Sequence, residues 1–160
     1  MKQALSAFGF ILFGLMMGVG VMRFAQTQQD LTELAARPER TADGRLALYY
    51  TAEDRAHISG EMLAFLQGVQ AISSAVVDED RETIQATAEA LRRGDGQGMG
   101  VQMKSPEGFR QIGRSLRQDF GAIADMAGTA SMPEVQIALS DAMTKCAACH
   151  GSYKAVEVSE

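Results

Sequence analysis

Residues 131–154 read SMPEVQIALSDAMTKCAACHGSYK, and this stretch combines a helix start with the most specific motif of the chain. Ser131-Met-Pro-Glu134 is a typical helix start, with a residue that can cap the helix, Pro in the first turn and an acidic residue near the N-terminus. Apolar residues then lead from this start into the motif: Val135, Leu139, Ala142 and Met143. The stretch predicts a helix that carries the motif at its C-terminal end.

The motif is Cys146-Ala-Ala-Cys149-His150, and it uses both cysteines and one of the two histidines of the chain. In a helix the two thiols share a face, because they lie three residues apart. Two thiols can reach the two vinyl groups of one porphyrin while the adjacent imidazole reaches the iron. C-x-x-C-H is the attachment motif of a c-type haem, so the sequence predicts one covalently bound haem c.

Two other interpretations of the cysteine pair are a redox dithiol and half of a zinc site. A thioredoxin-like dithiol is expected near a βαβ pattern, and no segment before Cys146 alternates like a strand. A tetrahedral zinc site would need His57 and His150 to complete four ligands, without a second C-x-x-C pair. The motif therefore favours haem attachment over both.

Three further helices are predicted before residue 131. The first begins at the capping box Thr51–Asp54 and ends near Val77, with an apolar face at spacings of three and four. The second begins around Asp78-Glu-Asp80, and the third begins at Ser105-Pro-Glu107 with Pro at the first helical position. These segments end at Gly94 and Gly128, and Gly94–Gly100 is predicted to be a loop. The apolar face of the first helix is formed by Ile58, Met62, Phe65, Val69 and Ile72. Four helices with short connections predict an all-α chain, an antiparallel four-helix bundle.

Composition agrees with a small helical protein, and because the residues form no catalytic constellation, we expect that it is not an enzyme. The chain has 160 residues, of which 46% are hydrophobic and only 6% aromatic. Its formal net charge of −5 disfavours nucleic acid as a partner, because the phosphates would be repelled. Glu61, Asp119 and Asp125 are explained by solvated helix faces, and Ser73-Ser74 has no partner histidine for a catalytic triad.

The N-terminus predicts a membrane segment. Ala4–Met22 is an uncharged, largely apolar run of 19 residues, roughly 28 Å long as a helix. A cleaved signal peptide is the alternative, but Arg23 stands where a cleavage site needs a small residue. We expect residues 1–25 to be a transmembrane anchor, 26–50 a tether and 51–160 the bundle. Within the tether, the apolar cluster Leu46–Tyr50 is expected to pack against the domain.

Together, the predicted helices and the motif near the C-terminus resemble a class II cytochrome c, the cytochrome c′ family, over residues 51–156. The resemblance implies that Cys146 and Cys149 carry the thioethers and that His150 is the proximal iron ligand. Members of the family commonly have an aromatic residue three positions after the histidine and Arg at the next. Here these positions hold Tyr153 and Lys154, and Lys154 keeps the positive charge near a haem propionate without the two-pronged geometry of Arg.

The resemblance leaves two functions open, which differ at the opposite face of the iron. In the family the first helix crosses that face, and Met62 is the candidate distal ligand of a low-spin electron carrier. A vacant site would instead give a high-spin protein that binds nitric oxide or carbon monoxide. His57 is a rival ligand but lies about 140° from Met62 around the helix. Arg55, two turns before Met62 on the same face, could reach a propionate; the alternative is an ordinary solvated arginine near the capping box.

Haem of this type is attached on the outer side of the bacterial inner membrane, so the soluble domain is expected in the periplasm. Expected partners are redox proteins of a respiratory or photosynthetic chain, and the family resemblance also allows a homodimer through the first two helices. A haem subunit of a larger membrane complex is a third hypothesis. Two of the 15 basic residues precede Gln26, which leaves 13 basic against 20 acidic residues beyond it. Lys145 and Lys154 flank the motif, however, so a positive docking patch is expected there.

Overall fold

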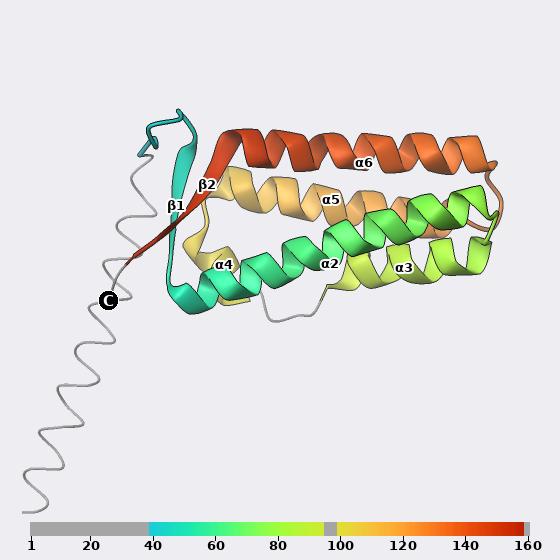
Figure 1. The fold of residues 1–160 in the computed structure, drawn as a ribbon, viewed down its shortest axis with the longest axis horizontal. Coiled ribbons are helices and arrows are strands. Elements are labelled where there is room, and N and C mark those ends of the chain that lie inside the picture. Colours follow the sequence, from blue (N-terminus) through green and yellow to red (C-terminus); the bar gives the residue numbers. More distant parts are fainter. Residues whose placement is uncertain (1–38, 95–98, 159–160) are drawn as a thin grey trace, which may run out of the picture.

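The computed structural model of the chain describes residues 39–94 and 99–158. The expected anchor and residues 26–38 of the expected tether lie outside these residues. In the described part, five helices and two strands follow one another in the chain (Figure 1). They are β1 (Leu46–Tyr50), α2 (Ala52–Val77), α3 (Arg81–Arg93), α4 (Met99–Lys104), α5 (Glu107–Met126), α6 (Met132–Ser152) and β2 (Tyr153–Glu157). The described residues are mostly helical, which confirms the expected all-α class apart from one small sheet.

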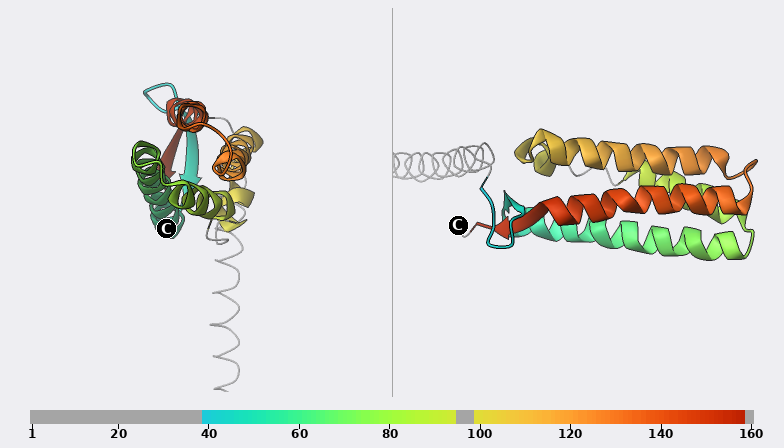
Figure 2. Two further views of the ribbon diagram at one scale, coloured as in Figure 1. Left: turned by 90° about the vertical axis from the view of Figure 1, so that its right-hand side faces the viewer. Right: turned by 90° about the horizontal axis from the view of Figure 1, so that it is seen from above.

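The four longer helices lie side by side, and each runs opposite to the one before it (Figure 1). A view along them shows α2, α3, α5 and α6 at four corners (Figure 2). In this arrangement α2 contacts α3 and α6, and α5 contacts the same two helices from the other side. The C-terminal end of α6, which holds the cysteine motif, therefore lies at the same end of the domain as the start of α2.

The helix boundaries follow the local signals in the sequence. Thr51 caps α2 by accepting a hydrogen bond from the backbone of Asp54, whose side chain accepts one back from Thr51. Ser131 and Glu134 make the same reciprocal pair at the start of α6. Gly94 caps the end of α3 with a φ of +64°, a conformation that glycine adopts without strain. The predicted ends of α2 and α3 are thus confirmed.

Two local features differ from the sequence prediction. Pro106 is the N-cap of α5 and not its first helical residue. The expected loop ends earlier than Gly100, because the short helix α4 begins at Met99. A helix of six residues leaves little periodicity to detect, which explains why α4 was not predicted.

Part of the expected tether, residues 46–50, forms strand β1. It pairs in parallel with β2, with Leu46 opposite Tyr153 and Tyr50 opposite Glu157. Leu48 and Tyr50 are buried, so the segment packs against the domain as expected. The buried hydroxyl of Tyr50 is 2.6 Å from that of Ser105, which in turn donates to the carbonyl of Val101. The sheet therefore joins the start of the folded region to the residues that follow the motif.

A half-buried ion pair connects α4 to the start of α2, and we expect it to stabilise the fold most strongly at neutral pH. Lys104 Nζ lies 2.8 Å from Asp54 Oδ2, with side chains 17% and 13% exposed. Burial alone would raise the pKa of Asp54, but the hydrogen bonds from Lys104 and Thr51 outweigh it and lower this pKa. Because the folded pKa is below the unfolded one, Asp54 stabilises the fold above the unfolded pKa. This contribution is lost as the pH falls through the folded value.

Lys104→Met should therefore lower the free energy of unfolding by about 2 kcal/mol at pH 7. The loss should shrink well below about pH 4, where Asp54 becomes protonated in both proteins. Urea unfolding at the two pH values measures it. Arg93→Met is the matched control, since Arg93 is 67% exposed and 3.5 Å from Glu89; it should cost less than about 0.5 kcal/mol. An equal loss for Lys104→Met at both pH values would contradict this role of the pair.

Candidate functional site

The apolar core is divided into two clusters. The larger one fills the space between the four long helices and includes Ile72, Ile84, Phe120 and Leu139, all essentially inaccessible to solvent. The smaller one lies beside the sheet. It consists of Leu48, Tyr50 and Val101, with Ile58, Phe109 and Tyr153 packed against it. The boundary between the clusters lies toward the end of the domain that holds the cysteine motif.

Helices α2 and α5 each contribute residues to both clusters, and on each helix one apolar residue lies between these contributions. On α2, Ile58 packs on the small cluster and Phe65 on the large one. Met62 lies between them at helical spacing. On α5, Ile112 lies in the same way between Phe109 of the small cluster and Leu116 of the large one. Within the described residues, Met62 and Ile112 are half-buried and belong to neither cluster.

The motif on α6 occupies the same boundary. Cys146 is half-buried and packs on the large cluster, whereas Tyr153, at the start of β2, packs on the small one. Cys149 is half-buried between these two residues. Cys149 and Met62, which are 87 positions apart, thus each lie along the chain between a residue of the large cluster and a residue of the small one, and belong to neither cluster themselves. The sequence named both residues but not the division, which depends on contacts between distant segments.

The two thiols are poorly suited to redox exchange. Both are free. Burial raises the pKa of Cys146, and burial together with the nearby Cys146 raises the pKa of Cys149. A reactive dithiol needs a lowered thiol pKa, because the thiolate is the nucleophile. Among the described residues, no group of three or more His, Cys, Asp or Glu side chains is gathered in a way that could hold a metal ion.

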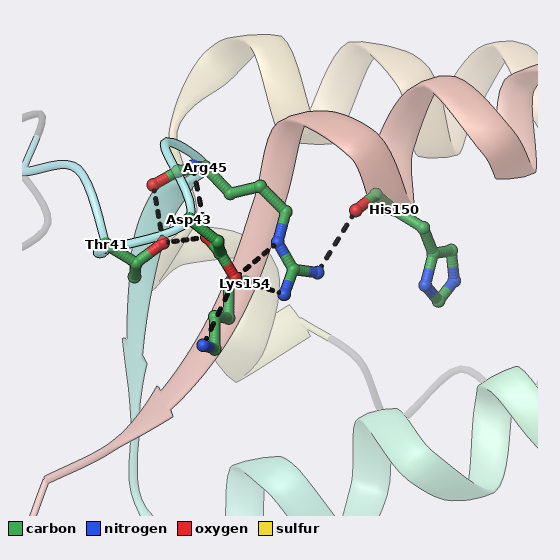
Figure 3. Close-up of polar contacts among 5 residues, drawn as sticks. All are labelled: Thr41, Asp43, Arg45, His150 and Lys154. Carbon is green, nitrogen blue, oxygen red and sulfur yellow. Dashed lines mark hydrogen bonds and ion pairs between the residues drawn. The ribbon is translucent and has the colours of Figure 1, made fainter.

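His150 is exposed in the last turn of α6. Its imidazole ring points away from α6 and away from a cluster of polar residues around Arg45 (Figure 3). Its backbone carbonyl accepts a hydrogen bond from Arg45 Nη1 at 3.2 Å. The backbone of His150 is therefore hydrogen-bonded to the polar cluster, whereas its ring points away from that cluster. The rival ligand His57 is half-buried on α2, next to Ile58 at the sheet end, and its Nε2 atom is sheltered from solvent.

The cations that the sequence assigned to the haem edge all have carboxylate partners. Arg55 forms an ion pair with Glu157 of β2, and Lys154 lies 3.3 Å from Asp43. Lys145, half-buried, forms an ion pair with Asp119 of α5. A positive patch at Lys145 and Lys154 is thus partly neutralised by these acids. Arg45 and Asp43 were not among the expected site residues, since only the pairing of β1 with β2 brings them to the end of α6.

A cavity of about 400 Å³ opens beside the boundary, between α2, the end of α3 and α5. Glu61 and Phe65, which line it, flank Met62 on α2. Arg117 from α5 spans it: its guanidinium bonds Glu61 at 2.7 Å and the carbonyl of Leu91 at 2.9 Å, and lies over the ring of Phe65. The lining is mostly apolar, and its polar side chains are Gln67, Thr87 and the ion pair of Glu61 with Arg117.

Comparison with known proteins finds no family, no curated protein and no solved structure that matches this chain. The case for a function therefore rests on its own residues and their arrangement.

Proposed function

We propose that this chain is a mono-haem c-type cytochrome of class II, an antiparallel four-helix bundle like cytochrome c′ that transfers electrons. The main support is the division of the core at the cysteine motif. Apolar clusters end on both sides of Met62, Ile112 and Cys149, which belong to three different helices. A planar apolar group held there would join the two clusters, and C-x-x-C-H is the motif that holds such a group covalently.

The residues present fit a haem. Cys146 and Cys149 would hold it through thioethers, His150 would ligate the iron, and Met62 would supply the opposite ligand from α2. When bound, the haem would take up and release one electron at its iron. The apolar clusters on both sides would shield part of the haem from water, although His150 itself is exposed. Met62 is unbranched and flexible, so it can adjust its sulfur position within the packed boundary.

We further propose that residues 1–25 anchor the protein in the bacterial inner membrane with the domain in the periplasm. In that oxidising compartment two neighbouring free thiols would tend to form a disulfide, which haem attachment prevents. A redox protein of a respiratory or photosynthetic chain would be the partner. Lys145 and Lys154 remain the proposed docking cations, although Asp119 and Asp43 reduce their net charge.

A second copy of the chain is the proposed neighbour of α2. By length and composition, α2 is the one helix within residues 39–94 and 99–158 that could cross a membrane. It packs along α3 and α6, however, and its Glu61 is paired with Arg117. Its apolar character comes partly from Leu63 and Leu66, which are 54% and 66% exposed. Burying them against a second bundle would account for apolar residues on a face turned to water.

Expression of the full chain in a bacterium with the c-haem maturation machinery tests the proposal. We expect the protein in the membrane fraction, a mass equal to the polypeptide plus one haem, and reversible reduction followed by optical spectroscopy. An unmodified polypeptide from that host would refute the proposed function. A mature N-terminus near Gln26 would show that residues 1–25 are a signal peptide and leave the cytochrome proposal intact.

A further inference from the structure

Arg45, outside the predicted bundle, contacts the last turn of the helix that carries the motif. Its Nη1 donates to the carbonyl oxygen of His150 at 3.2 Å, across 105 positions of sequence (Figure 3). The strand register explains the contact. Leu46 is paired with Tyr153, so the preceding residue, Arg45, lies alongside the end of α6.

The guanidinium of Arg45 is itself held in place. Its Nη2 and Nε donate to Asp43 Oδ2 at 2.7 and 3.2 Å, and Lys154 Nζ reaches the same oxygen at 3.3 Å. The backbone between Thr41 and Arg45 is a tight turn closed by hydrogen bonds at 2.8 Å. Gly44 has a φ of +84° in this turn, which other residues rarely adopt. The turn and Asp43 therefore orient Arg45 independently of its hydrogen bond to His150.

A guanidinium group stabilises the C-terminal end of a helix. The last four carbonyls of an α-helix have no partner within the helix, and a cation near them interacts favourably with the helix dipole. The last turn of α6 contains no Lys or Arg, and His150 is its only basic residue. Arg45 supplies a cation and a donor from a distant segment, and it does so at His150, the proposed iron ligand.

We propose that Arg45, held by Asp43, is a positioning residue for His150: it fixes the last turn of α6 and thereby the direction of the imidazole. The inference rests on the proposed function, in which His150 ligates the iron. Under this proposal Asp43 and Arg45, which precede the bundle in sequence, contribute to the haem site. If Arg45 and Asp43 acted only through their charges, the expected effect on the reduction potential would be different. Arg45→Gln removes a cation and Asp43→Ala an anion, so charge alone would shift the reduction potential in opposite directions.

The test uses the full-length, haem-loaded protein and four variants: Arg45→Gln, Asp43→Ala, Arg45→Lys and the control Arg93→Gln. The control also removes one exposed positive charge, but Arg93 lies on α3, is 67% exposed and pairs with Glu89 of the same helix. Hydrogen exchange of the amides of residues 150–153 reports the order of the last turn. The hyperfine-shifted proton resonances of the His150 ring in the oxidised protein report its orientation at the iron.

We expect Arg45→Gln and Asp43→Ala each to speed the exchange of these amides, the former by about tenfold, and to shift the ring resonances. Arg45→Lys should show less of both effects than Arg45→Gln, and Arg93→Gln should match the wild type. Unchanged exchange and unchanged ring resonances in Arg45→Gln would overturn the proposal. So would opposite shifts in potential without faster exchange. Mass spectrometry measures haem attachment independently of these readouts. If no haem is attached, hydrogen exchange in the haem-free chain still tests the hydrogen bond between Arg45 and the carbonyl of His150.

Discussion

Replacing both Cys146 and Cys149 by alanine is expected to abolish the retention of haem in denaturant. Noncovalent packing and iron ligation are lost when the chain unfolds, whereas thioether bonds survive. Cys149→Ala alone should leave one thioether and a shifted optical spectrum. The measurement is haem content after denaturing electrophoresis, together with the mass of the intact protein. The effect is expected to be all-or-none for the double variant, because the chain has no other thiol.

The matched control lies within the motif. Ala147 and Ala148 separate the cysteines and are exposed on the outer side of α6. Changing both to serine keeps the spacing of the thiols and their burial, so this variant should retain haem at the wild-type level. Haem that stays bound in denaturant after both cysteines are replaced would contradict covalent attachment through the motif.

Met62→Ala is expected to convert a low-spin spectrum to a high-spin one, lower the reduction potential and open the site to carbon monoxide. A His/Met pair fills both axial positions and favours reduced iron, so its loss changes all three properties together. Optical spectra of both oxidation states, a redox titration and carbon monoxide binding measure the change. Met103→Ala is the control, since Met103 is 73% exposed on α4 and belongs to neither apolar cluster in the described residues.

The same measurements decide between the two functions that the resemblance left open. A wild-type protein that is already high spin and binds carbon monoxide readily at neutral pH would rule out ligation by Met62. The gas-binding function would then become the better explanation. In that case Met62→Ala should alter only the access of ligands to the iron and leave the spin state as it was.

Local sequence was sufficient for most helix boundaries. The capping boxes at Thr51 and Ser131 and the glycine at residue 94 act through bonds within a few positions, so they are visible without a fold. The two strands were not predicted. Their residues, LALYY and YKAVE, carry too little pattern to indicate a strand, and each is stabilised by pairing with a partner about a hundred positions away.

The candidate site shows the same contrast. C-A-A-C-H could be interpreted from sequence because attachment of a haem depends on covalent chemistry at a fixed spacing. The partners of Arg55 and Lys154 could not be foreseen, because Glu157 and Asp43 approach them only through the sheet. Long charged side chains pair with whatever acid the fold places within reach, and spacing along one helix does not determine that acid.

By itself, the sequence determined the four long helices, their apolar faces and the motif at the end of the last one. These depend on helical periodicity, capping and the identity of neighbouring residues. The tertiary structure alone decided that the apolar core divides at Met62 and Cys149 and that Arg45 reaches the carbonyl of His150. Both features depend on the relative placement of segments far apart in the chain, which packing and strand register establish and local sequence does not encode.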